Sequence, residues 1–159
     1  MRLIQYNRQA AVNYAVEWAL GRNPQYYNFD GLGGDCTSFA SQCLYAGSGV
    51  MNYTKDTGWY YSSINDRAAA WSSVEYFRKF LLSNTAFGPM ASPASISHLE
   101  LGDFIQLFND FEYYHTLIVT GFEHGIPLVC AHTDDSLMRS LNSYYYNSAA
   151  GLHITGVGA

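Results

Sequence analysis

Cys36 is the residue of this sequence whose position points most clearly to chemistry. It follows the glycine-bearing stretch Asn28 to Asp35, and the apolar pattern after it predicts a helix over residues 36–46. A thiol in the first turn of a helix lies beside free backbone amides and the positive end of the helix dipole, which favour the thiolate. The same amides can bind the oxyanion that forms when a carbonyl is attacked. We therefore expect this segment to supply a nucleophile and an oxyanion hole together.

The other two cysteines fit a simpler interpretation. Cys43 lies within the apolar run of the same predicted helix, and Cys130 lies in a predicted strand. Free cysteine commonly behaves as a small buried apolar residue, so we expect both to belong to the core. That interpretation stays open for Cys36 as well. Three cysteines cannot all pair, so at least one thiol remains free.

Two of the five histidines are expected on the two arms of one hairpin, His115 at the start of the first arm and His132 at the end of the second. Side chains alternate between the faces of a strand, so the pairing register decides where these rings point. If paired residue numbers add to an odd sum, His115, His132 and Asp134 share a face. An even sum places Thr133 opposite His115 and turns His132 to the other face. The remaining histidines, His98, His124 and His153, have no such companion.

A general base beside Cys36 needs a third group. An imidazole that takes the thiol proton has its other nitrogen held by an acceptor, which fixes its tautomer and direction. Either His132 or Asp134 could hold His115 in this way, and the residue pattern leaves both open.

A zinc site is the main chemical alternative, since Cys36, His115 and His132 could supply one sulfur and two nitrogens. The sequence lacks the closely spaced ligand pairs, such as CxxC or HxxxH, that anchor most such sites. The glycine-rich stretch 31–34 is not followed by the Lys and Ser/Thr of a phosphate-binding loop. We therefore predict a thiol enzyme with no metal and no cofactor.

The elements that must position these residues change in kind along the chain. Helical spacing of apolar residues predicts helices over residues 6–20, 36–46 and 72–84, the last opened by a capping box of Ser72 and Glu75. Apolar and β-branched runs predict strands over residues 103–108, 115–120, 126–132 and 152–157. Residues 28–35, 49–67 and 86–97 are expected to be loops. Helices first and strands later indicate an α+β fold with an antiparallel sheet.

The composition fits one domain over residues 1–159 with an aromatic-rich core. Of its residues, 48% are hydrophobic, 16% aromatic and only 13% charged, where about 25% charged is usual. The net charge is −5 and there is no basic stripe, which disfavours nucleic acid as a partner. No apolar run approaches the roughly 20 residues of a transmembrane helix. The first residues lack the apolar segment of a secretory signal, so we expect a secreted protein if the chain is a mature portion and a cytoplasmic one otherwise.

The sequence resembles the bacterial putative amidase domain, a relative of the NlpC-type and CHAP-type cysteine peptidases of papain-like fold. The hallmark of that domain is similar to residues 35–47, DCTSFASQCLYAG. Further similar stretches follow in the family's order: residues 6–12, 23–24 and 28–30, Trp71, residues 102–106, His115 and residues 131–133. The resemblance covers nearly the whole chain and implies a papain-like α+β fold in a bacterial protein.

The resemblance also implies roles. Cys36 matches the nucleophile and His115 the general base. In NlpC-type enzymes the third polar residue lies on the strand after the catalytic His, which favours His132 first and leaves Asp134 second. Asp35 matches the motif too, with an expected structural role at the helix start. The best-known relatives cleave amide bonds in cell-wall peptides, so the expected partner is a peptide or amide substrate of that kind.

Two alternatives to an amidase stay open. A non-catalytic module on the same fold could hold a peptide or glycan through the aromatic stretch Tyr53, Trp59, Tyr60 and Tyr61. An acyltransferase or transpeptidase would use Cys36 and His115 with an acceptor other than water. For a substrate cleft, Asp35, Trp59 and Tyr60 are the candidate contact residues.

Overall fold

The first half of the chain is mainly helical and the second half mainly strand, which confirms the predicted α+β class. The computed structural model describes all residues from 1 to 159. The helices are α1 (Arg8–Trp18), α2 (Cys36–Ser48), α3 (Ala69–Ser72) and α4 (Val74–Ser83), with short 3-10 turns η1 (Ile96–His98) and η2 (Leu141–Ser143). No helix is long and apolar enough to span a membrane.

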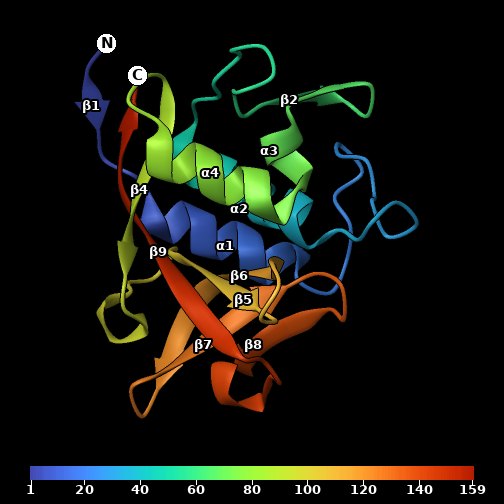
Figure 1. The fold of residues 1–159 in the computed structure, drawn as a ribbon, viewed down its shortest axis with the longest axis vertical. Helices are drawn as coiled ribbons and strands as arrows, with labels where there is room; N and C mark the ends of the chain where they lie inside the picture. The colour runs from blue at the N-terminus through green and yellow to red at the C-terminus, as the bar shows by residue number, and fades with distance from the viewer.

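Most strands belong to one curled antiparallel sheet (Figure 1). Its order is β1-β9-β5-β6-β7-β8, and β4 also pairs with β9. The bounds are β1 Leu3–Ile4, β4 Gly88–Ala94, β5 Phe104–Phe108, β6 Tyr113–Glu123, β7 Ile126–Ala131, β8 Ser136–Ser140 and β9 Ser148–Gly158. A separate hairpin of β2 (Tyr61–Ser63) and β3 (Asp66–Arg67) lies before α3. The helices gather against one side of the sheet, and the two chain ends lie side by side (Figure 1).

The sheet buries both of its faces. On one face, Phe104, Ile118 and Cys130 pack with α1, α2 and α4 in the larger core. On the other face, Leu107, Leu117 and Val129 form a smaller core that Leu99 and Leu141 close, and these two residues lie beside η1 and in η2. Alternate residues of β5, β6 and β7 therefore reach different cores, as the side-chain period of a strand requires.

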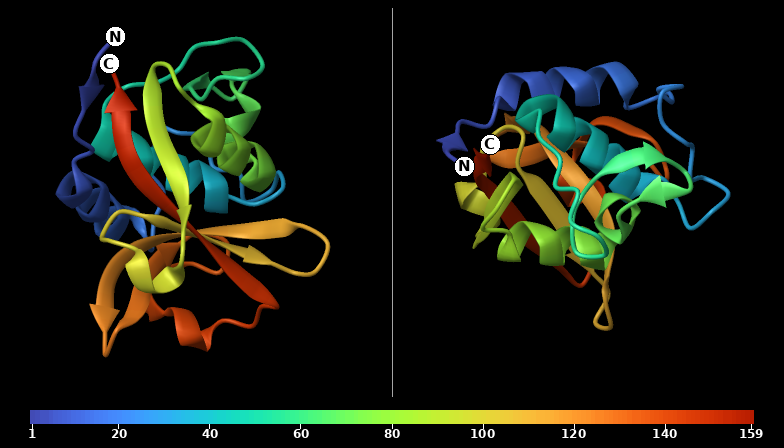
Figure 2. Two further views of the ribbon diagram at one scale, coloured as in Figure 1. Left: turned by 60° about the vertical axis from the view of Figure 1, so that its left-hand side comes forward. Right: turned by 90° about the horizontal axis from the view of Figure 1, so that it is seen from above.

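Two predicted elements need correction. Residues 86–97 are not a loop, because β4 runs alongside β9 within them (Figure 2). Pro89 and Pro93 are tolerated there because β4 pairs only with β9, and an edge strand can lack two amide donors.

The cap of α4 also differs from the prediction. It is Ser73, which accepts from the Tyr76 amide, whereas the Ser72 hydroxyl accepts from Arg67 Nε at 3.1 Å. The prediction also missed β1 and β8, and the expected loop 49–67 contains the β2–β3 hairpin.

Helix α2 runs through the centre of the molecule, and eleven of its residues are buried. It continues past Gly47, the predicted end, and stops at Gly49, whose φ of 68° is left-handed. Gly47 lies where the chain before α1 crosses α2. A Cβ atom at Gly47 would lie 2.4 Å from Tyr6 Cε1 and 2.7 Å from the Asn7 carbonyl oxygen. A glycine here therefore allows close packing of the two segments.

We expect Gly47→Ala to destabilise the fold by about 1–3 kcal/mol, because overpacking against a backbone oxygen outweighs the roughly 1 kcal/mol that Ala gains in helix propensity. Urea unfolding measures the change. The control is Gly31→Ala, since a Cβ at Gly31 meets nothing within 4 Å. A Gly47→Ala protein as stable as the wild type would contradict the packing argument.

Candidate active site

Cys36 and His115 line the same pocket, of about 370 Å³. Cys36 is the first residue of α2, and His115 lies near the start of β6. Both are nearly buried, each with 8% of its surface exposed. The next residue on β6, Thr116, faces α2, and its hydroxyl lies 3.1 Å from that of Thr37. The structure thus brings the predicted nucleophile and base together at the junction of α2 and β6.

The pocket holds these two groups in their neutral forms. Burial raises the pKa of the Cys36 thiol, although the backbone amide of Thr116 and the hydroxyl and amide of Thr37 oppose the rise. Burial lowers the pKa of His115 to about 4, Arg139 adds to this effect, and the carboxylate of Asp134 opposes it. Burial thus opposes the thiolate that the helix start was expected to favour. The Cys36 sulfur contacts the Thr37 hydroxyl at 3.7 Å and makes no hydrogen bond to His115.

His132 points away from His115. The hairpin pairs Glu123 with Ile126, but a bulge at Thr120 shifts the register, so that Ile118 pairs with Cys130. Beyond the bulge the paired numbers add to an even sum, and His132 continues the helix-facing series of Cys130. Its ring stacks on Phe39 of α2, with centroids 3.9 Å apart.

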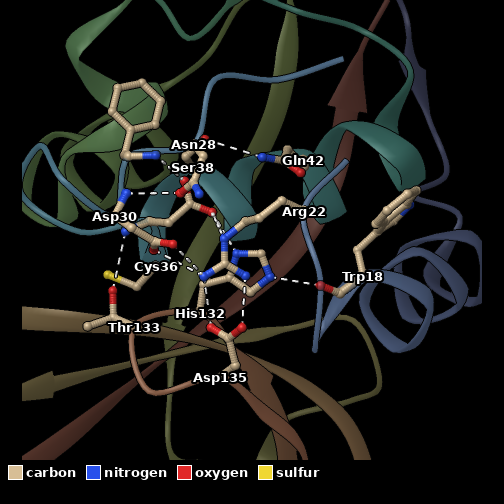
Figure 3. A network of polar contacts seen from close by, with 12 residues as sticks. Trp18, Arg22, Asn28, Asp30, Cys36, Ser38, Gln42, His132, Thr133 and Asp135 are labelled. Atoms are coloured by element: carbon tan, nitrogen blue, oxygen red, sulfur yellow. Dashed lines mark hydrogen bonds and ion pairs between the residues drawn. The ribbon is translucent and has the colours of Figure 1, made fainter. Parts of the chain in front are cut away.

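Both ring nitrogens of His132 have other partners. Nδ1 lies 2.6 Å from Asp35 Oδ2, and Nε2 lies 2.8 Å from the carbonyl oxygen of Trp18 (Figure 3). His132 and the Asp35 side chain are each about 1% exposed. The structure therefore places the first-choice orienting group against the start of α2 and not on His115.

Asp134, the second choice, lies in the Cys36 pocket with His115. Its side chain is 90% exposed, and its Oδ2 accepts from Arg139 Nη1 at 3.4 Å. Its φ of 64° is left-handed, as is that of Thr133, which lets the chain turn sharply between β7 and β8. The negative charge nearest to His115 in the pocket is therefore that of a loop carboxylate.

The three predicted substrate contacts lie elsewhere. Asp35 is buried in the pair with His132. Trp59 is fully buried against Trp71 and donates from Nε1 to Ser41 Oγ at 2.9 Å, so its ring is a core residue and does not face a cleft. Tyr60 lines a different hollow, with Lys55 and Tyr76 among its neighbours. None of the three reaches the Cys36 pocket, whereas Cys43 and Cys130 are buried as predicted.

Sequence reasoning missed the polar and aromatic residues that shape the pocket. Arg139 at the end of β8 donates to Ser143 Oγ from Nε at 2.7 Å, and its guanidinium lies 3.7 Å from the ring centroid of Tyr144. Tyr145 is 98% exposed at the pocket rim. The run of three tyrosines that begins at Tyr144 was a signal in the sequence. Because β8 was not predicted, there was no reason in the sequence to locate this run near Cys36. No three His, Cys, Asp or Glu side chains lie close enough together to hold a metal ion.

Comparison with known proteins defines the family. The family model of the putative amidase domain matches residues 5–155. This chain belongs to that family. It is also 37% identical over 147 residues to the uncharacterized protein YhbB of Bacillus subtilis (strain 168), covering 87% of this chain and 45% of that protein. No solved structure matches the chain, so the relation to papain-like, NlpC-type and CHAP-type enzymes stays a prediction.

The buried His115 predicts a specific pH dependence of stability. The pKa is about 4 in the folded chain against an ordinary 6.5, so the unfolded chain binds the proton more readily between these values. The contribution of His115 is therefore fully present above pH 6.5 and is lost as the pH falls toward 4, by roughly 3 kcal/mol over the window. Urea unfolding of wild type and His115→Gln between pH 4 and 7 should show this slope in the wild type alone.

The NMR titration of the His115 imidazole is the direct check, with a midpoint expected near 4. A midpoint at 6.5 or above would show that the ring is not desolvated as the structure indicates.

Proposed function

We propose that this domain is a cysteine amidase in which Cys36 attacks an amide carbonyl and His115 transfers the protons. The observation that carries the proposal is the shared pocket. Of the chain's three thiols, Cys36 alone lines a pocket beside an imidazole, and it stands at the first turn of a helix. Membership of the putative amidase domain family points to amide bonds as the substrate.

The neutral pair sets the order of proton transfers. His115 accepts the thiol proton as Sγ attacks the carbonyl carbon, and the imidazolium then gives that proton to the leaving amine. A water molecule next attacks the thioester carbon while His115 takes one of its protons. The tetrahedral intermediate then collapses, the bond between the carbonyl carbon and Cys36 Sγ breaks, and the imidazolium returns the proton to the sulfur as the acyl group leaves as a carboxylic acid. The backbone amides at the start of α2 stabilise the oxyanion of each tetrahedral intermediate.

Asp134 supports the protonated state of the base. Its carboxylate raises the pKa of His115, against burial and Arg139. This helps most while the imidazolium exists, between attack and expulsion of the amine. Asp134 therefore stabilises the protonated His115 by its charge, as the third residue of a catalytic triad does, although it makes no hydrogen bond to the ring.

Arg139 indicates the chemistry of the substrate. It is the pocket's cationic side chain, and its contact with Asp134 at 3.4 Å is long and lies in a solvated rim. A substrate carboxylate can take the place of Asp134 on this guanidinium with shorter, paired hydrogen bonds. We infer that the substrate is a peptide with a free carboxylate near the scissile amide, and a cell-wall peptide is the first candidate of this kind.

Incubation with purified Bacillus subtilis peptidoglycan, followed by mass spectrometry of the released fragments, tests the amidase activity. Cys36→Ala is expected to abolish cleavage, and His115→Ala to lower the rate by at least about 100-fold, the usual effect of losing a general base. His98→Ala is the matched control, because that ring is exposed and lies outside the pocket. Wild-type turnover in either pocket variant would refute the mechanism.

The same assay in ¹⁸O-labelled water separates a hydrolase from an acyltransferase. A hydrolase incorporates the label into the new carboxylate, whereas a transferase joins the acyl group to an added amine acceptor.

Arg139→Gln should raise KM about tenfold or more for the cleaved peptide with its free carboxylate, with a smaller change in kcat, since a charge-assisted hydrogen bond contributes about 1.5–3 kcal/mol. The control substrate is the same peptide with that carboxylate converted to an amide, for which wild type and variant should have similar KM. Equal KM increases for both peptides would show that Arg139 acts only on the pocket's structure.

A further inference from the structure

Each ring nitrogen of His132 makes one hydrogen bond, Nε2 to the Trp18 carbonyl oxygen and Nδ1 to Asp35. The Trp18 carbonyl oxygen can only accept, so Nε2 of His132 donates to it across 2.8 Å. Nδ1 shares a second hydrogen with Asp35 Oδ2 across 2.6 Å. Buried side chains at this depth require such partners. His132 thus joins the end of α1 to the start of α2.

The Asp35 side chain has two further polar neighbours. Oδ1 accepts from the Phe29 amide at 2.9 Å, and Nε of Arg22 lies 3.7 Å from Oδ2. Arg22 itself is held by two hydrogen bonds to Asp30 and two to Asp135 (Figure 3). Asp35 is thus bonded on one oxygen to a backbone amide and on the other to His132.

Asp35 occupies the N-cap position of α2 but does not cap it. In this chain Asn7 caps α1 and Ser73 caps α4, each accepting from an amide three residues ahead. Asp35 makes no such bond, because both of its oxygens are taken by Phe29 and His132. Its backbone, with φ −102° and ψ 5°, also departs from the extended conformation of the other two.

The amides of the first turn of α2 are consequently left without an oxygen acceptor. The first backbone bond of the helix runs from the Phe39 amide to the Asp35 carbonyl at 2.9 Å, and no oxygen accepts from the amides of Cys36, Thr37 or Ser38. The Thr37 amide acts instead on the Cys36 sulfur. Because these amides adjoin Cys36 in the first turn, they are the oxyanion donors of the proposed mechanism.

We propose that His132 is a positioning residue that acts on Cys36 through Asp35: its Nδ1 hydrogen bond holds the carboxyl group away from the first-turn amides of α2. This inference rests on the proposed function in taking Cys36 as the nucleophile. Without the proton donor, the carboxylate is free to accept from the Thr37 or Ser38 amide, as an N-cap aspartate usually does. There it would lie closer to Cys36, whose thiol pKa the charge of Asp35 already raises.

The other charged groups near Cys36 belong to a separate set. Across the pocket from Cys36 lie His115 on β6, Asp134 in the turn before β8 and Arg139 on β8. None of them makes a hydrogen bond or ion pair with Asp35 or His132. A change at His132 therefore affects Cys36 through Asp35. A shift in the His115 titration would instead indicate an effect that passes through the pocket residues.

Two substitutions separate the two hydrogen bonds of His132. In His132→Asn the side-chain amide nitrogen takes the place of Nδ1 and can still donate to Asp35. In His132→Gln it takes the place of Nε2 and can still donate to Trp18, but the donor to Asp35 is lost. The probe is iodoacetamide, with alkylation of Cys36 followed by mass spectrometry from pH 5 upward.

We expect the alkylation midpoint of His132→Gln to rise by about one pH unit, which is about tenfold less thiolate at neutral pH, while His132→Asn stays near wild type. Adding Asp35→Ala to His132→Gln should return the midpoint toward wild type, because the intruding carboxylate is gone. The His115 titration should not move in any variant. If the Gln variant does not fold, the Asn variant decides: a raised midpoint there overturns the proposal.

Three further results would overturn it: equal midpoints in the wild type and the Gln variant, a double variant no better than His132→Gln, or a shifted His115 titration in His132→Gln. Because iodoacetamide needs no amide substrate, the outcome is independent of turnover. Missing amidase activity with the Gln–Asn difference present would overturn the proposed function alone. Turnover without that difference would overturn the positioning role alone.

Discussion

The architecture of the site depends on one constraint: the Asp35 side chain, buried at the start of α2, must find its hydrogen-bond partners outside that helix. His132 meets the need from the end of β7, 97 residues away in sequence. Thr133, the next residue, accepts from the Asp35 amide at 3.2 Å, and Arg22 ties the turn at Asp135 to the loop at Asp30. The loop before α2 and the turn after β7 are therefore fixed together, and the pocket lies where they meet β6.

Burial of both reactive groups has a second effect. A neutral thiol beside a neutral imidazole is a less reactive resting state than an ion pair, because charge separation in a poorly solvated pocket is unfavourable. The polar environment needed for charge separation is nonetheless built in, through the amides of α2 and Thr116 and the carboxylate of Asp134. In the mechanism we propose, Cys36 therefore ionises only when a substrate carbonyl is present to receive the sulfur electrons.

Local periodicity and turn residues predicted the main helices and the hairpin, whereas the placement of Cys36 beside His115 was an expectation from the family resemblance. The sequence could not predict which way His132 faces, since one bulge at Thr120 reverses the parity of the hairpin and leaves no mark in composition. The prolines of β4 suggested a loop, although an edge strand tolerates them. Trp59 was predicted to contact a ligand, whereas it is buried against Ser41 and Trp71. The sequence could not show this burial, because only the tertiary fold brings these residues close.

The positions of the other two thiols have a consequence for studies of motion. Cys43 and Cys130 are completely buried on facing elements, α2 and β7, of the larger core. A small thiol reagent reaches them only when these elements separate, so their labelling rates report the free energy of opening the core. In the same sample, the rate at Cys36 reports the accessibility and ionisation of the pocket. The protein thus carries intrinsic probes of global and local opening that can be read together without any added label site.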